Sequence, residues 1–468
     1  MAAAKARLDG DTLVARFITE TDWDRLPEAV RAKAKMCLMD NLSAVVGGTQ
    51  ATVSRIAAEF AGTCMSGDRA TVLVHGGRAS TAGAAFANAT AANALDSDDG
   101  ARYAYGHAGA QLFPTTVAVA EGQESSGAEL LSAMVVGYEV AHRIGRCWHN
   151  EHDVYQACGS WGSVACAAAA AHLLKLDLEQ TKNALGIADY HAPNVPMMRD
   201  IADPAMVKHG IGWGAVTGIS ASELASRGFT GIPTLLNKSE YRGWAEDIGR
   251  HFIMIDGVGW KARGYACCGW AHAAAEGAGK LMKEYRIKTK QIDRIIVETF
   301  AESAALGTRL PATTEQAQFN LAWPVAAMLV DGEIGPAQTL EHRLQDETIR
   351  ALASKVEVRE SEQLNELQRL FQAGDPRGRF ASRVTLILNN DRRLESGLVE
   401  GGFLYPAPAW DRKQMEKKFH WLVDPVLGGR QADRLIELVW DFEQQSGVGQ
   451  LIRATLHPEA RAPAGAGS

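Results

Sequence analysis

The chain has 468 residues, of which 46% are hydrophobic and 22% charged. This composition is typical of a folded protein of two or three domains and excludes a disordered or fibrous chain. Lys and Arg total 48 against 55 for Asp and Glu, a net charge of -7, so the chain lacks the basic excess of a nucleic-acid binder and no nucleic-acid partner is expected.

The seven cysteines include no C-x-x-C pair, which argues against a disulfide framework and predicts a cytoplasmic location. The N-terminus has no apolar stretch of the kind a secretory signal needs. No apolar run approaches the ~18 residues needed to cross a bilayer, so no membrane association is expected.

The first part of the chain predicts one helix after another. Apolar residues recur at helical spacing over 30–45 and Gly47-Gly48 ends the run. Ser80 can cap a helix through Leu95, and Ser126 with Glu129 forms a capping-box pattern. Further helices are expected over 160–174 and 213–228.

After about residue 285 the pattern changes to that of strands. Residues 293–300 and 355–359 have strand character, and 383–388 with 392–399 predicts a hairpin around Asn389-Asn390-Asp391. A helix is expected over 324–330, and residues 411–445 are helical again. We therefore predict a mainly α fold with an α+β lid. We predict that the chain divides into an all-helical domain over 1–270, completed by 405–457, an α+β domain over 271–404 and a disordered tail over 458–468.

Common catalytic signatures are missing. The sequence contains no G-x-S-x-G, no Walker loop and no H-E-x-x-H, and it offers no set of three cysteines spaced for an iron–sulfur cluster. Cys267, Cys268 and His272 are the nearest approach to a metal site, but adjacent cysteines do not readily face one ion. No metal and no cofactor are predicted.

Three polar segments stand out. Asp96, Asp98 and Asp99 precede Arg102 and His107, which suits acid–base chemistry or, alternatively, a solvated loop that caps the next helix. Lys208 stands at the expected start of a helix, where its positive charge is unfavourable against the helix dipole. It therefore has an anionic partner or, alternatively, lies on the surface. The segment 261–272 gathers cations, Tyr265 and a histidine before an Ala-rich helix, where an anion is favoured; simple burial accounts equally well for its cysteines.

Five stretches, taken in order, resemble the 2-methylcitrate dehydratase (MmgE/PrpD) family, whose members include cis-aconitate decarboxylase and iminodisuccinate epimerase. The stretches are Leu95–Glu121, Gly162–Asp177, Met206–Gly231, Tyr265–Ala278 and Phe319–Gly335. The resemblance implies a helical domain with an α+β lid, a site between them, a homodimer, no organic cofactor and a small di- or tricarboxylate substrate.

The resemblance also carries over individual positions. The family's acidic motif falls on Asp96 and Asp99, its following histidine on His107, its helix-start lysine on Lys208 and its later histidine on His272. Other positions depart from the family pattern: Gln156-Ala157 replaces His-Pro, Arg263 replaces a lysine, Gly100 stands where some members have Thr, and Cys268 and Trp323 stand where decarboxylases have His and Tyr.

From these positions we assign roles. The catalytic residues are predicted to be Asp96, His107, Lys208 and Tyr265, with Asp96 and His107 as the acid–base pair. The substrate-binding residues are predicted to be Asp99, Arg102, Gln156, Arg263, Cys268 and His272. Cations are needed because ion-paired carboxylates fix the orientation of the substrate and stabilise the charge that develops when the α-proton leaves.

The leading functional hypothesis is a cofactor-independent lyase that removes water from a hydroxylated polycarboxylate. An epimerase or isomerase is the first alternative, a decarboxylase of cis-aconitate type the second, and an inactive binding homologue the non-enzymatic one.

Overall fold

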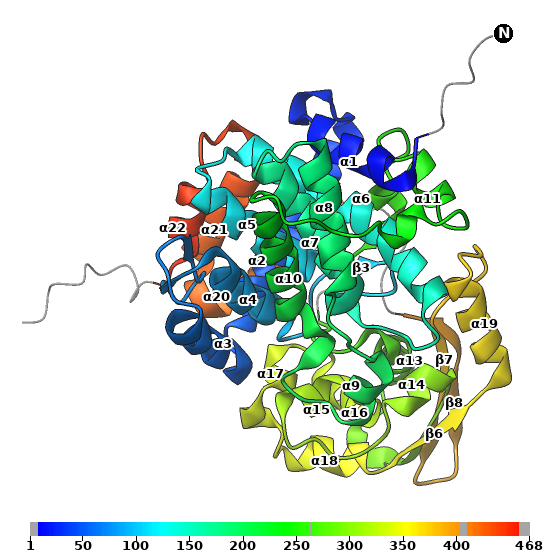
Figure 1. The fold of residues 1–468 in the computed structure, drawn as a ribbon. Helices are drawn as coiled ribbons and strands as arrows, with labels where there is room; N and C mark the ends of the chain where they lie inside the picture. Colours follow the sequence, from blue (N-terminus) through cyan, green and yellow to red (C-terminus); the bar gives the residue numbers. More distant parts are fainter. Residues whose placement is uncertain (1–7, 262–263, 402–409, 458–468) are drawn as a thin grey trace, which may run out of the picture.

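The computed structural model describes residues 8–261, 264–401 and 410–457. Helices dominate, with one four-stranded sheet near the C-terminal third of the chain (Figure 1). The predicted mainly α fold with an α+β part is confirmed. Among the described residues no helix is both long and apolar enough to cross a membrane.

The larger part is a layered helical bundle around small side chains. Helix α7 is buried along its whole length and packs on α6 and α10, because its Ala, Gly and Ser residues let neighbouring helices approach closely. The α-helices of this larger part are α1 (Gly10–Glu20), α2 (Glu28–Gly48), α3 (Thr52–Cys64), α4 (Thr81–Asn93), α5 (Gly109–Gly122), α6 (Gly127–Glu151), α7 (Cys158–Leu173), α8 (Leu178–Tyr190), α9 (Met197–Ala202), α10 (Ile211–Ala225), α11 (Gly243–Glu246) and α12 (Met254–Gly257).

Local sequence signals set several of these boundaries as expected. Ser80 caps α4 by accepting from the backbone N–H of Gly83, and Ser126 with Glu129 forms the capping box of α6. Two short strand pairs interrupt the predicted all-helical part. They are β1 (Ala70–Thr71) with β2 (Arg78–Ala79), and β3 (Gly100–Ala101) with β4 (Val258–Gly259).

The C-terminal helices return to this bundle. Helix α20 (Arg412–Leu427) packs on α2, and α21 (Gly429–Trp440) and α22 (Gly449–Thr455) follow it. In Figure 1 these orange and red helices lie among the blue N-terminal ones. Their apolar residues share one core with those of residues 14–260.

The smaller part has a second core, formed by residues 265–394 with Ala157, Met197 and Ile201. Its sheet has the order β6-β5-β7-β8, with β5 parallel to β6 and antiparallel to β7. The predicted hairpin is β7–β8, and α13 packs on its face. The elements are α13 (His272–Tyr285), β5 (Ile292–Thr299), α14 (Ala301–Ala305), α15 (Thr314–Gln318), α16 (Ala322–Asp331), α17 (Pro336–Thr339), α18 (Glu347–Ala353), β6 (Val356–Glu360), α19 (Glu362–Gln372), β7 (Ala381–Leu388) and β8 (Arg393–Glu400). The predicted domain boundaries stay predictions, and the tail 458–468 lies outside the described residues.

Candidate active site

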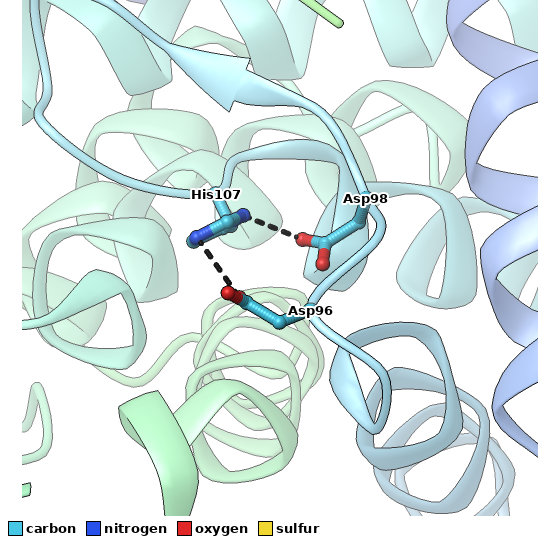
Figure 2. Close-up of side chains that lie close together, drawn as sticks. All are labelled: Asp96, Asp98 and His107. Carbon is cyan, nitrogen blue, oxygen red and sulfur yellow. Dashed lines mark ion pairs between the residues drawn. The ribbon is translucent and has the colours of Figure 1, made fainter. Parts of the chain in front are cut away.

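The acidic loop after α4 forms the centre of the site. Asp96 has a φ of 51°, in the left-handed region that non-glycine residues rarely adopt. This turn brings its carboxylate and that of Asp98 to His107, which precedes α5 (Figure 2). All three side chains are buried.

The two ring nitrogens of His107 have different partners. Nδ1 lies 2.9 Å from Oδ2 of Asp98 and 2.9 Å from the backbone oxygen of Asp99. Both are acceptors, so Nδ1 carries the proton of the neutral ring. Nε2 is then the nitrogen able to take up a proton, and it lies 3.5 Å from Oδ1 of Asp96.

Two buried lysines face Asp96 from the other side. Nζ of Lys261 lies 2.8 Å from Oδ2 of Asp96, and Nζ of Lys208 lies 4.0 Å from Oδ1. Burial alone would raise the pKa of Asp96, but the charges of Lys261, Lys208 and His107 hold it well below its usual range. Asp96 is therefore ionised, and Lys208 has the anionic partner that its position at a helix start predicted.

The lysines differ in their own ionisation. Burial lowers the pKa of Lys208 despite the neighbouring Asp96, whereas the charge of Asp96 overcomes burial and raises the pKa of Lys261. Lys208 also donates to the backbone oxygen of Asn93 at 2.6 Å and to Gln318.

Asp99 belongs to a separate network. Its carboxylate accepts from the hydroxyl of Tyr138, from Asn41 at 3.4 Å and from the backbone N–H of Gly109, the first residue of α5, at 3.0 Å. Burial raises its pKa. Asp99 thus accepts from the first N–H of α5, whose N-cap residue is Ala108, while Asp96 and Asp98 face the imidazole. The expectation of a solvated loop is wrong, because all three carboxylates are buried.

Asp96, Asp98 and His107 also have the spacing of metal ligands, since one ligand atom from each lies within 4.8 Å of the others. The ammonium group of Lys261 already contacts Asp96, and a divalent cation placed there would meet its charge. The donor set therefore fits a metal poorly, and acid–base chemistry suits it better.

A cavity with about 680 Å³ of empty space, part of it open to solvent, lies beside this cluster where the two cores meet. The larger part contributes Asp96, Ala101, Arg102, Tyr105, Gly106, His107, Tyr155, Ala157, Cys158, Met197 and His209. The α+β part contributes Cys268, Gly269, Trp270, Gln368, Phe371, Gln372 and Phe380.

Four of the predicted site residues line the cavity, namely Asp96, Arg102, His107 and Cys268. Lys208 does not line the cavity, but its ammonium lies 4.0 Å from Oδ1 of Asp96, which does. Arg263 lies outside the described residues.

The structure does not bring four other predicted residues to the cavity lining. Asp99 faces Tyr138, as described above. The side-chain oxygen of Gln156 accepts a hydrogen bond from the backbone N–H of Val195 at 2.8 Å. Tyr265 donates to Glu276, and its ring lies tilted against that of His272 with the centroids 4.4 Å apart. Nε2 of His272 lies 3.1 Å from the backbone oxygen of Cys267.

The sequence reasoning missed several residues of the site. Asp98 is noted in the acidic segment but has no assigned role, Lys261 stands in a segment singled out for other residues, and His209 follows Lys208 directly. Burial lowers the pKa of His209 to about 3, so its ring is neutral. Residues of α19 such as Gln368 and Phe371 carried no sequence signal, because an amphipathic surface helix has the same pattern wherever it packs.

Two family models match the chain, one following the other along the sequence. Residues 12–251 match the family model described as the MmgE/PrpD N-terminal domain, and residues 265–444 match the MmgE/PrpD C-terminal domain. Together the two models cover most of the chain.

Similar proteins come from two fungi. The chain is 25% identical to a cis-aconitate decarboxylase-like protein, oryM, of Aspergillus oryzae, over 93% of this chain and 95% of that protein. It is 26% identical to a cis-aconitate decarboxylase of Aspergillus terreus, over 76% of this chain and 79% of that protein.

Proposed function

The chain belongs to the MmgE/PrpD family, and from that premise we propose that it is a cofactor-independent lyase that removes water from a small hydroxylated di- or tricarboxylate. The observation that carries this proposal is His107. Its Nδ1 is held by the backbone oxygen of Asp99 and the carboxylate of Asp98, which leaves Nε2 to act as a general base for a ligand in the cavity that His107 lines.

In the proposed reaction Nε2 of His107 takes the proton from the carbon next to a substrate carboxylate. The electron pair of that bond forms the alkene as the C–O bond of the neighbouring hydroxyl breaks. The imidazolium returns the proton to the departing oxygen, so that water leaves and His107 is neutral again. The ionised Asp96, 3.5 Å from Nε2, stabilises the imidazolium in between.

This mechanism changes the role expected for Asp96. A carboxyl whose pKa is held well below its usual range by Lys261 and Lys208 is a poor proton donor at neutral pH, although burial acts in the other direction. We assign Asp96 to charge stabilisation and Arg102, at the cavity, to holding a substrate carboxylate.

Decarboxylation is the second candidate, because the similar fungal proteins are named cis-aconitate decarboxylase or cis-aconitate decarboxylase-like protein. The similarity extends over most of their length. The positions at which the resemblance places decarboxylase His and Tyr are Cys268 and Trp323 here. Trp323 is fully buried and donates to the backbone oxygen of Gln338 at 2.8 Å, away from the cavity lining, which favours water loss.

The test is proton NMR in deuterated water with citrate, 2-methylcitrate, citramalate and cis-aconitate. Water loss produces an alkene signal from a hydroxy acid. Exchange of the α-hydrogen without an alkene would instead make the protein an epimerase, and carbon dioxide release from cis-aconitate would make it a decarboxylase. If the protein binds members of the panel and converts none, the inactive-homologue reading replaces the proposal.

A further inference from the structure

Three of the seven residues that the α+β part contributes to the cavity lining are aromatic. The rings of Phe371 and Phe380 lie 4.5 Å apart, and Phe380 stacks at 5.7 Å on Phe300, which is buried behind it. Trp270 is the third aromatic residue, and Met197 of the larger part lies in the same lining. We call Trp270, Phe371 and Phe380 the aromatic wall.

The described cavity lining contains a single guanidinium, that of Arg102. Its Cζ lies 5.5 Å from the centre of the Phe371 ring, and its buried Nε has no hydrogen-bond partner. The described structure records no ion pair for Arg102, so it is suited to a substrate carboxylate.

The other charges near the cavity largely compensate one another. Lys208 and Lys261 face Asp96, and Asp98 faces His107. Among the described lining residues, these pairs leave Arg102 to bind a substrate carboxylate. A carboxylate placed against the aromatic wall would have no cation beside it, and an unpaired charge among apolar groups is costly.

Gln368 adds a polar group to the same wall. It is only 4% exposed and its Oε1 has no hydrogen-bond partner, although it lies in the cavity lining. It precedes Phe371 by three residues on α19, so both side chains share one helix face. An unpaired carbonyl oxygen at this place can accept from a substrate hydroxyl.

We propose that the substrate is a hydroxy-dicarboxylate whose remaining substituent is an alkyl or aryl group, in place of the third carboxylate arm of a citrate. This inference rests on the proposed function. One carboxylate lies on Arg102, and the apolar substituent packs on the aromatic wall.

The test is a series of malates substituted at carbon 2 with methyl, ethyl, propyl and benzyl groups, compared with citrate and 2-methylcitrate. For wild type we expect kcat/KM for water loss to rise about fourfold per buried methylene, to level off once the wall is covered, and to exceed the value for citrate. Binding of each compound, measured by thermal shift, follows the same order.

A Phe371→Ser variant reports on the wall itself. It is expected to flatten the rise along the series, whereas Phe229→Ser, at a half-exposed ring outside the cavity lining, keeps the wild-type slope. If the Phe371 variant does not fold, the wild-type substrate series still tests the proposal without it.

The outcomes separate the two proposals. Water loss from citrate with kcat/KM at or above that of the propyl compound overturns the apolar-substituent inference and leaves the lyase intact. Binding that strengthens along the series without water loss from any compound supports the inference and overturns the lyase.

Discussion

Three non-glycine residues with positive φ line the cavity, namely Asp96 at 51°, Tyr105 at 47° and His209 at 56°. Such conformations cost of order 1–3 kcal/mol each and persist where the surrounding contacts fix them. For Asp96 the fixing contacts are the ion pair with Lys261 and the hydrogen bond from Lys261 to its backbone oxygen.

The imidazole of His107 gives the most direct prediction at this scale. His107→Asn keeps an amide N–H near the position of Nδ1 and removes Nε2, so kcat should fall about 10²- to 10⁴-fold, the range for loss of a general base. His420→Gln is the matched control, because that imidazole also contacts an aspartate, at 2.9 Å from Asp424, but lies outside the cavity. Steady-state kinetics on any converted substrate checks this, and a loss below tenfold contradicts the role.

Lys261→Met tests the buried ion pair. Removing one partner of such a pair costs about 3–5 kcal/mol because the other charge stays buried, so the unfolding free energy measured in urea should drop by this amount. Arg55→Met breaks an exposed pair with Glu59 and should cost less than about 1 kcal/mol. The double variant with Asp96→Asn should recover part of the loss, and equal losses for Lys261→Met and Arg55→Met would exclude the proposed stabilisation.

The sequence was sufficient to single out Asp96 and His107, because the motif keeps them within eleven positions of each other. It could not identify Lys261 as the partner of Asp96, since the two residues are 165 positions apart and their segments meet through the long-range pairing of β3 with β4. Chemistry and motif position alone point to Tyr265 and Gln156. In the structure Tyr265 donates to Glu276, and Gln156 bonds to Val195 and Asn194, outside the cavity lining.

At the scale of elements, caps and periodicity predicted helix and strand positions well. The starts of α4 and α6 follow their serine caps, and the β7–β8 hairpin follows alternating residues and an Asn-rich turn. What local patterns do not encode is which element faces the cavity, as α19 illustrates: its apolar face packs on β7 while Phe371 and Gln368 also reach the cavity.

Helix α1 provides a prediction of pH dependence. Burial raises the pKa of Asp11 to about 6, although Thr234 donates to its carboxylate from both its backbone N–H and its hydroxyl. Because the folded-state pKa is above the unfolded value of 3.8, the contribution of this group is fully present below pH 3.8 and is lost as the pH rises through about 6.

The measurement compares wild type with Asp11→Asn by urea unfolding between about pH 4 and pH 7. The difference in unfolding free energy, wild type minus variant, should fall as the pH rises across this window. Asp375→Asn is the control: hydrogen bonds from Arg377 lower the pKa of Asp375 to about 2, so its contribution is constant over the same range. A constant difference for Asp11→Asn as well would contradict the prediction.

For the whole molecule, the cavity couples the two cores because both contribute to its lining. A carboxylate ligand present at 100 times its Kd should raise the unfolding free energy by about 2.7 kcal/mol. Hydrogen exchange should slow in α19 as well as in the loop 96–107, since both face the ligand. Protection confined to one of the two parts would show that the ligand binds elsewhere.

The pairing of α20 with α2 has a consequence for synthesis of the chain. Lys418 forms a fully buried ion pair with Asp40, 378 positions earlier. A ribosome adding about 5–20 residues per second needs roughly 20–80 s to travel from one to the other. During that time the aspartate and the apolar surface of α2 have no α20 to cover them. The nascent helical bundle is therefore open until the α+β part has emerged, and it is a natural client for a chaperone over that interval.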